Sequence, residues 1–340
     1  MSVTIRDVAA MAGVSPSTVS RTCKNNSSIS EETKKKVRAA MSKLGYEPNF
    51  KASNLASQNS RTIGIILPVS ERTMYVNSFF LEIIRGITQY CNSKQYITTI
   101  ITGESEKEVL QTIRSMIRNG LVDSFIFLYS KKNDPVIDFM HNKGILYALI
   151  GNAYQFANQT IYVDTDNISA GKDATEYLIR MNHNRIGFIG YEMSQLFSAD
   201  RKYGYELAHL EHNLPLNPDY YFEIKHSPTL LPDRLTQLLQ SSNSPTAFVV
   251  ADDFLAVALE HHCQQYKLSV PDDLSIVSFN NSLFAQLAST PVTSIDINSI
   301  QLGIEAATQI IKHLENPALA ATKTIVPHKI VERESITAIQ

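Results

Sequence analysis

The 340-residue sequence predicts an α/β fold, with two lobes built on parallel sheets and a small all-α head in front of them. Over residues 62–340, short apolar runs alternate with amphipathic stretches, which is typical of parallel strands joined by right-handed crossover helices. This part is too long for one such sheet at ordinary domain size, so two similar lobes are expected. Residues 1–45 show helical periodicity only and therefore form a separate head.

The composition indicates a globular protein without a membrane partner. Apolar residues make up 44% of the chain and charged residues 19%, which excludes wholesale disorder. No apolar run is long enough to span a membrane, and the first residues lack the apolar core of a signal peptide. The three cysteines, Cys23, Cys91 and Cys263, form neither a disulfide framework nor a zinc-spaced pair. We therefore expect a reducing, cytoplasmic compartment.

Charge is unevenly divided along the chain. Residues 1–60 carry nine Lys/Arg and four Asp/Glu, a net charge of +5. Since the whole chain has 31 basic and 33 acidic side chains, residues 61–340 have a net charge of −7. A basic head on an acidic body points to a polyanionic partner for the head. Chance clustering is the alternative, because Lys34–Lys36 supply three of these charges and could form a solvated helix face.

Three short helices are expected in the head. The first begins after Thr4 and ends at Gly13, since glycine readily adopts the left-handed conformation that ends helices. Ser15 caps the second helix, with Pro16 at its first position, and Ser30 caps the third. Two helices joined by a short glycine-containing turn form a helix-turn-helix.

The second helix carries the side chains expected to contact DNA, because in this motif its N-terminal part enters the major groove. Small hydroxylated side chains allow the backbone to approach DNA, and one arginine can bind a guanine edge through two hydrogen bonds. The candidate residues are Ser15, Pro16, Ser17, Thr18, Ser20 and Arg21. On this pattern alone, a three-helix packing module without a ligand is an alternative.

The head resembles that of the lactose-repressor (LacI) family of bacterial transcriptional regulators. The matching segments are TIRDVAAMAGVSPSTVSR at residues 4–21 and LGYEPN at residues 44–49. The resemblance implies double-stranded operator DNA as partner and a homodimer, whose two heads bind the two halves of a near-palindromic site. It implies DNA contacts by Thr4, Ile5, Ser15, Pro16, Ser17, Thr18, Ser20, Arg21, Asn25, Tyr46 and Asn49.

Residues 46–61 separate the head from the body and contain few large apolar side chains after Phe50. Composition alone predicts a linker. The family resemblance implies a hinge that becomes helical on operator DNA, with Leu55 wedged between base pairs in the minor groove and the small Ala52 beside it. Ser53 and Ala56 replace an arginine and a lysine found in family members, so weaker or altered hinge contacts are expected.

Seven strands and five helices are expected in the body, residues 62–340. The strands are Ile63–Leu67, Ile97–Ile101, Phe125–Tyr129, Leu146–Ile150, Ile186–Ile189, Ala247–Val250 and Leu274–Phe279. The helices are Phe79–Asn92, Glu106–Asn119, Ala170–Met181, Arg201–Glu211 and Phe254–Tyr266. The resemblance extends over this part and implies the two-lobed architecture of periplasmic sugar-binding proteins.

The effector site is expected between the lobes, because ligands of open parallel sheets bind beyond the carboxyl ends of the strands. A sugar needs planar hydrogen-bonding side chains and an aromatic face. By position along the family pattern, the candidates are Arg201, Asn152, Asp252 and Asn280 for hydroxyl groups and Phe79 and Phe80 for stacking. Simpler roles are alternatives: a surface ion pair of Arg201 with Asp200 or Glu206, a helix cap at Asp252, and core packing of both phenylalanines.

No catalytic or metal site is expected. The sequence has no glycine-rich phosphate loop and no Gly-x-Ser-x-Gly elbow, and the adjacent His261 and His262 point apart on a helix. We therefore expect neither an enzyme nor a cofactor. A freestanding sugar-binding protein, the alternative from another class, would have a signal peptide and no basic head.

Within the family, the resemblance is greatest to the maltose-operon repressors of Gram-positive bacteria, through segments Phe125–Tyr129, Gly171–Ile179 and Ser294–Ser299. It implies maltose or a maltodextrin as effector, acting either as inducer or as co-repressor. The alternative is a global carbon-catabolite regulator of the same family, whose co-repressor is a phosphorylated carrier protein.

Overall fold

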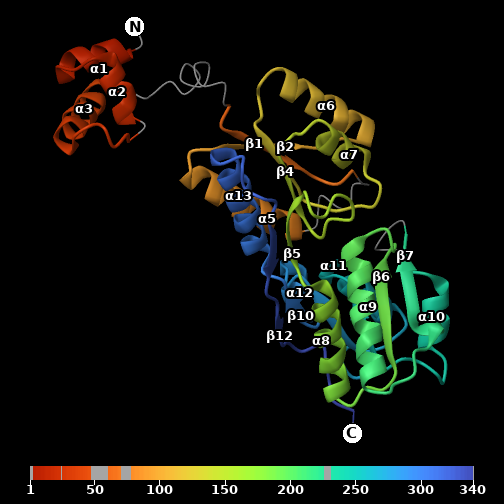
Figure 1. The fold of residues 1–340 in the computed structure, drawn as a ribbon. Helices are drawn as coiled ribbons and strands as arrows, with labels where there is room; N and C mark the ends of the chain where they lie inside the picture. The colour runs from red at the N-terminus through yellow and green to blue at the C-terminus, as the bar shows by residue number, and fades with distance from the viewer. Residues whose placement is uncertain (1–2, 24, 47–59, 70–77, 226–230, 340) are drawn as a thin grey trace. The chain divides into compact units, whose positions relative to one another are not determined.

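The computed structural model describes residues 3–23, 25–46, 60–69, 78–225 and 231–339. The chain divides into two compact units, residues 1–60 and 61–340. Figure 1 shows three helices in the first unit and two α/β lobes in the second. Three residues of the predicted DNA-binding set lie outside the described residues, as does most of the predicted hinge: Asn49, Ala52 and Leu55.

The head contains the three predicted helices: α1 (Ile5–Ala12), α2 (Pro16–Cys23) and α3 (Glu31–Leu44). They enclose a small core whose fully buried members are Val8, Val19 and Val37. Each helix contributes one of these valines, so the apolar periodicity of the sequence is the feature that packs the head together.

The ends of the head helices follow the capping signals of the sequence. The hydroxyls of Ser15 and Ser30 each accept a hydrogen bond from the backbone N–H three residues later, at 3.2 and 3.3 Å. Gly13 and Gly45 lie after α1 and α3 with φ of 65° and 64°, the left-handed conformation expected of a helix-ending glycine.

The first lobe is a six-stranded parallel sheet in the order β11-β5-β4-β3-β1-β2. Its strands are β1 (Thr62–Ile66), β2 (Ile97–Ile101), β3 (Ser124–Phe127), β4 (Tyr147–Ile150), β5 (Ile161–Thr165) and β11 (Lys323–Val326). One face of the sheet packs against α5 (Ser78–Ser93) and α13 (Ser299–Glu315), and the other against α6 (Glu106–Arg118) and α7 (Pro135–Asn142) (Figure 1).

The second lobe is also six-stranded, in the order β12-β10-β9-β8-β6-β7. Its strands are β6 (Ile186–Tyr191), β7 (Tyr221–Ile224), β8 (Ala247–Val250), β9 (Ser275–Phe279), β10 (Thr293–Asp296) and β12 (Lys329–Val331). Its helices are α8 (Asn167–Arg180), α9 (Leu196–Glu211), α10 (Asp233–Leu239), α11 (Asp253–Gln265) and α12 (Leu283–Leu287). The pairings in this sheet are parallel, as predicted, except at one edge, where β12 pairs antiparallel with β10.

The chain passes between the lobes three times. Strand β5 of the first sheet is followed by α8 of the second lobe, β10 of the second sheet by α13 of the first lobe, and β11 of the first sheet by β12 of the second. The connecting segments are only residue 166, residues 297–298 and residues 327–328. The orientation of the lobes therefore depends on the backbone of very few residues.

All seven strands and five helices predicted for the body are present; β2 and β8 have the predicted bounds, and the ends of the others are shifted. The largest shift is at α9, which begins at Leu196 rather than Arg201. Five strands and four helices in the described part of the body were not predicted: β5, β7, β10, β11, β12, α7, α10, α12 and α13.

Each lobe contains one crossing of two helices at which glycines face each other. Gly86 of α5 lies against α13, and Gly303 of α13 lies against α5. A Cβ atom on Gly303 would overlap the carbonyl oxygen of Ile83. Gly171 of α8 and Gly204 of α9 repeat this arrangement in the second lobe.

We expect Gly303→Ala to lower the free energy of unfolding by about 1–3 kcal/mol, because the added methyl group forces α5 and α13 apart. The loss would occur although alanine favours helices more than glycine does. Urea unfolding followed by circular dichroism measures it, with the exposed Gln301→Ala on the same helix as control. Equal unfolding midpoints for Gly303→Ala and the wild type would contradict the prediction.

Candidate functional site

A cavity of about 420 Å³ lies between the two lobes. The first lobe contributes two aromatic residues of α5 and a residue after β4, and the second lobe contributes α9 and the segments after β8 and β9. The structure places all six predicted effector residues in its wall: Phe79, Phe80, Asn152, Arg201, Asp252 and Asn280. Side chains that are far apart in the sequence therefore meet at one site.

Arg201 is held rigidly in the wall and is 3% exposed. Its Nε donates to Oδ1 of Asn167 at 2.9 Å, and one terminal nitrogen donates to the carbonyl oxygen of Ala251 at 2.5 Å. Its guanidinium carbon lies 4.2 Å from the centre of the Phe279 ring. Burial lowers its pKa to about 10, so the side chain stays charged at neutral pH. The geometry does not show the surface ion pair with Asp200 or Glu206 that was the alternative.

Asp252 caps a helix and also lies in the cavity wall, where the effector role predicted for it stays a prediction. One carboxylate oxygen accepts a hydrogen bond from the backbone N–H of Leu255 at 2.8 Å and caps α11. The other accepts a hydrogen bond from the hydroxyl of Tyr191 at 2.8 Å, and both side chains line the cavity. Burial raises the pKa of Asp252, while these hydrogen bonds and the nearby Arg201 oppose the rise.

The two phenylalanines belong both to the core and to the cavity wall. Phe80 is 8% exposed and Phe79 is half-buried, and their rings meet edge to face at 5.3 Å between centres. Both line the cavity. An aromatic face for a sugar ring is therefore available without excluding the core role.

Several residues of the cavity wall were not predicted from the sequence. Aromatic ones are Tyr129, Tyr191, Phe197 and Phe254, and polar ones include Glu106, Lys131, Asp134, Asp164 and Asn167. Several of these lie at or just beyond the end of a strand. That position is the sequence signal that could have identified them, because parallel strands end at the same edge of a sheet.

The outer side of the cavity contains a direct contact between the lobes. Lys131, after β3, forms an antiparallel bridge with Gln195, the residue before α9. The ammonium group of Lys131 also lies 2.9 Å from a carboxylate oxygen of Glu106. These three residues line the cavity, which indicates that the lobes are closed on each other here.

Asp164 is a half-buried acid in the cavity wall, near the end of β5. One carboxylate oxygen accepts hydrogen bonds from the N–H of Thr165 (2.8 Å) and from Nδ2 of Asn167 (3.1 Å). Desolvation raises its pKa to about 7, although the N–H of Thr165 and the charge of Arg201 oppose the rise. The acid is therefore partly protonated at neutral pH.

This pKa predicts a pH dependence of stability. Folded Asp164 keeps its proton up to about pH 7, whereas an unfolded aspartate loses it near pH 4, so its contribution to stability falls as pH rises between these values. When the pH falls from 7.5 to 5.5, the unfolding free energy of the wild type should rise through protonation of Asp164. In Asp164→Asn, this rise should be smaller by about 1–2 kcal/mol. Urea unfolding at both pH values measures it, with the exposed Asp272→Asn as control. An unchanged pH dependence in Asp164→Asn would show that this acid does not titrate there.

The N-terminal part of α2 in the head is polar and exposed to solvent. Ser15, Pro16, Ser17 and Arg21 are exposed, and the hydroxyls of Ser15 and Ser17 lie 2.8 Å apart. Thr18 and Ser20 are half-buried. This face offers the hydroxyl groups and the arginine expected of a helix that enters the major groove.

The other predicted DNA contacts of the head also have roles within it. The Asp7 carboxylate accepts hydrogen bonds from the N–H and the hydroxyl of Thr4, at 2.8 and 2.7 Å. Ile5 and Tyr46 pack against the head core. Asn25 accepts a hydrogen bond from the guanidinium of Arg38 at 3.0 Å.

No group of three or more His, Cys, Asp or Glu side chains within the described ranges is arranged to hold a metal ion. Among the helices that the structure describes, none has the length and apolar character needed to cross a membrane.

Comparison with known proteins agrees with this geometry. Residues 4–49 match the model of the bacterial regulatory proteins of the lacI family, and residues 175–336 match that of a periplasmic binding protein-like domain. The HTH-type transcriptional regulator MalR of Streptococcus pneumoniae is 36% identical over 337 residues, which cover 98% of this chain and 100% of that protein. The chain belongs to the LacI family. The regulator MalR of Staphylococcus xylosus is 33% identical, with 99% of both chains covered.

A solved structure of the family supports the same assignment. The probable maltose operon transcriptional repressor MalR from Staphylococcus aureus has a TM-score of 0.75 and 26% identity, covering 82% of this chain and 98% of that one. The protein is thus a MalR-like transcriptional repressor and not an enzyme, as predicted. The catabolite control protein A of Priestia megaterium is more distant, at 28% identity, which disfavours the alternative of a carbon-catabolite regulator.

Proposed function

We propose that this LacI-family repressor controls genes of maltose or maltodextrin utilisation, and that such a sugar, bound between the lobes, switches its affinity for operator DNA. The observation that carries the proposal is the cavity of about 420 Å³, whose wall contains all six predicted effector residues. Its size falls within the range of about 300–1,000 Å³ typical of small-molecule sites.

The chemistry of the wall suits a neutral sugar. The guanidinium of Arg201 and the carboxylates of Asp252 and Asp164 offer donors and acceptors for neighbouring hydroxyl groups. The rings of Phe79 and Phe80 offer apolar faces for the C–H side of a sugar ring. Maltose is favoured among sugars by the segments shared with maltose-operon repressors and by the similarity to the probable maltose operon repressor of Staphylococcus aureus.

The head supplies operator binding in this proposal. The exposed face of α2 enters the major groove, and Leu55 and Ala52 of the hinge, which are outside the described residues, contact the minor groove. We retain the predicted division into a head (residues 1–45), a hinge (46–61) and a body (62–340), and the cytoplasm as the compartment. The head's net positive charge supplies phosphate contacts and a steep salt dependence.

Switching follows from a difference in sugar affinity between two arrangements of the lobes. A sugar that binds one arrangement more tightly shifts the population toward it. If that arrangement holds the paired hinges poorly, operator affinity falls, and a tenfold fall needs about 1.4 kcal/mol of differential binding. We propose induction, the release of DNA by sugar, as the sign of the response.

Electrophoretic mobility shifts test this function. An inverted-repeat duplex, selected by the protein from random sequences, is titrated with and without maltose, maltotriose or glucose. We expect maltose or maltotriose to weaken operator binding at least tenfold and glucose to have no effect. Tighter binding with maltose would reverse the sign to co-repression. The proposal fails if no maltodextrin changes operator binding and none binds the protein in calorimetry.

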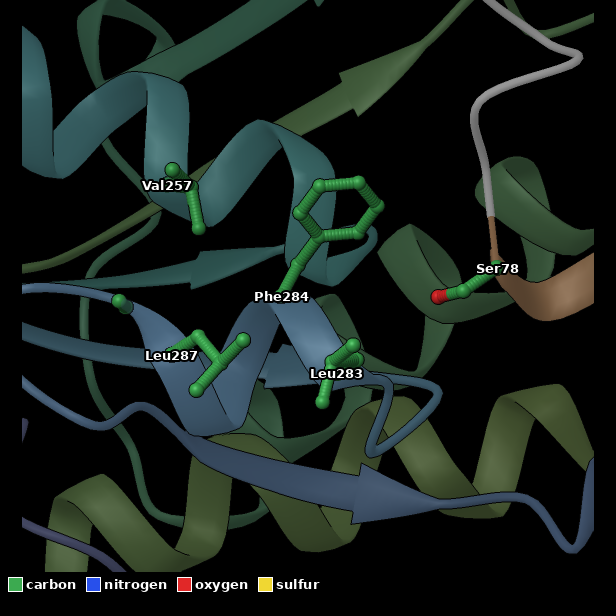
Figure 2. Close-up of a pocket in the computed structure, with 6 residues that line it drawn as sticks. Ser78, Val257, Leu283, Phe284 and Leu287 are labelled. Carbon is green, nitrogen blue, oxygen red and sulfur yellow. The ribbon is translucent and has the colours of Figure 1, made fainter.

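A homodimer contact is proposed on the exposed apolar face of α12. Leu283 and Leu287 are 57% and 74% exposed and border an apolar pocket of about 260 Å³. Figure 2 shows these leucines with Phe284 and Val257 on one side of the pocket and Ser78 on the other. An exposed apolar patch next to a pocket is typical of a protein–protein contact, and two-fold symmetry would bring two such faces together.

We expect Leu287→Asp to shift the protein from dimer to monomer, because the contact would place two carboxylates in an apolar interface. Sedimentation velocity measures the assembly state. Leu210→Asp is a matched control, since Leu210 is 71% exposed on α9 away from this pocket. A Leu287→Asp variant that stays as dimeric as the control would place the dimer contact elsewhere.

A further inference from the structure

Asp296 lies where the chain leaves the second lobe for the first. It is the last residue of β10, and Ile297 and Asn298 connect it to α13. Ile297 is 3% exposed and lines the cavity. Asp296 is therefore adjacent both to the cavity wall and to a crossover between the lobes.

One oxygen of Asp296 is directed at the crossovers. Its Oδ1 accepts a hydrogen bond from the backbone N–H of Asn298 at 2.8 Å. The side chain of Asn298 donates in turn to the carbonyl oxygen of Pro327, in the third crossover, at 2.5 Å. Lys329, the first residue beyond that crossover, has its Nζ 3.7 Å from Oδ2 of Asp296. Asp296 thus contacts the second crossover directly and is connected to the third through the side chain of Asn298.

The other oxygen contacts the loop that carries Asn280. Oδ2 of Asp296 accepts a hydrogen bond from Nδ2 of Asn281 at 3.2 Å. The N–H of Asn281 donates to the hydroxyl of Ser294 at 3.0 Å, and Arg333 donates to its side-chain oxygen. Asn280 and Asn281 have φ of 97° and 50°, which asparagine tolerates better than most residues other than glycine, and the contacts of Asn281 hold this loop in place. The position of Asn280 in the cavity wall therefore depends on these contacts.

We propose that Asp296 is a positioning residue that couples occupancy of the cavity to the orientation of the lobes. An effector that binds Asn280 shifts Asn281, and Asp296 transmits this shift to the second and third crossovers. The inference rests on the proposed function, because it concerns how a bound sugar changes operator affinity. Beyond the proposed function, Asp296 is assigned as the residue that connects the sugar site to the crossovers on which the orientation of the lobes depends.

The hydrogen-bond donors around Asp296 suggest substitutions that break its contacts selectively. Two N–H donors face its two oxygens, and asparagine has only one acceptor oxygen, so Asp296→Asn leaves one donor facing another donor. Asn281→Gly removes the same contact from the opposite side, and glycine adopts the left-handed φ without strain. Lys329→Met removes only the ion pair of a side chain that is 65% exposed and serves as the control.

The measured quantity is the coupling factor, the ratio of operator Kd with saturating maltose to operator Kd without it. We expect Asp296→Asn and Asn281→Gly each to reduce this factor by about two- to thirtyfold. The double variant should lose less than the sum of the two single losses, because both variants break the contact between Asp296 and Asn281. Maltose affinity in the absence of DNA, measured by calorimetry, should change less than the coupling factor, and Lys329→Met should resemble the wild type.

The outcomes separate this inference from the proposed function. A wild-type protein that binds no maltodextrin and whose operator binding responds to none would contradict the proposed function. Hydrogen exchange would still test Asp296 in that case, since Asn281→Gly should speed exchange at the N–H of Asn298, on the far side of the carboxylate. A responsive wild type with unchanged coupling in both variants would overturn the inference, as would unchanged exchange at Asn298. If Asp296→Asn fails to fold, Asn281→Gly alone decides.

Discussion

Replacement of Arg201 by methionine is expected to weaken maltose binding by about ten- to a hundredfold and to remove the response of operator binding to the sugar. Two nitrogens of Arg201 are engaged by Asn167 and Ala251, which fixes the plane of the guanidinium. A guanidinium has five N–H groups, so three remain beyond these two hydrogen bonds, and we expect them to donate to a ligand in the cavity. A hydrogen bond to a charged group contributes about 1.5–3 kcal/mol, which corresponds to this change in Kd.

The same substitution should destabilise the body. The positive charge of Arg201 lies among the carboxyl groups of Asp164, Asp252 and Asp253. Removing one partner from a buried group of charges costs about 3–5 kcal/mol, because the others lose their compensation. Thermal unfolding with and without maltose measures both effects. The wild type should be stabilised by maltose, and Arg201→Met should unfold at lower temperature with no shift by the sugar.

Two further variants distinguish charge from geometry. Arg201→Lys keeps the charge but lacks the planar fork, so it should recover part of the stability and little of the sugar affinity. Arg118→Met removes an exposed arginine of α6 and should behave as the wild type. A folded Arg201→Met protein with wild-type affinity for maltose would exclude Arg201 from the effector site.

The six predicted cavity residues were chosen by their position along the family pattern, and all six lie near the carboxyl end of a strand or on the helix that follows one. Asp252 follows the apolar run of β8 directly, and Asn280 follows β9 in the same way. Asn167 and Asp164 were missed because their place depends on β5, a strand in which polar residues alternate with apolar ones. The pairing of Asn167 with Arg201 joins residues 34 positions apart and has no local sequence signal.

The sequence predicted the fold class and the central strands of both sheets, whereas the edge strands β11 and β12 were not predicted. Central strands such as β3 and β8 are buried at every position and appear as continuous apolar runs. Edge strand β11 is largely exposed, and β12 has only three residues, so neither has a clear apolar pattern. The antiparallel direction of β12 results from the third crossover, a long-range feature that periodicity cannot reveal.

Replacement of Arg21 by alanine is expected to reduce operator affinity by about 2–6 kcal/mol for a dimer, because both heads lose the contact. Arg21 is exposed in the last turn of α2. A bidentate contact of arginine with guanine contributes about 1–3 kcal/mol of discrimination per site. The head should fold normally, because its core of Val8, Val19 and Val37 does not include this side chain. Fluorescence anisotropy with operator and random duplexes measures the change.

The ratio of the affinity for operator to the affinity for random duplex shows whether Arg21 contacts a base or a phosphate. If Arg21 contacts a base, its replacement should lower the affinity for operator far more than the affinity for random duplex. If it contacts a phosphate, its replacement should lower both affinities about equally. Lys36→Met provides the comparison, since Lys36 is exposed on α3 and pairs with Glu32 at 2.8 Å. Equal losses on operator and random DNA for Arg21→Ala would assign the side chain to phosphate. Sequence recognition would then depend on the hydroxyl groups of Ser15, Ser17 and Ser20, and on the hinge.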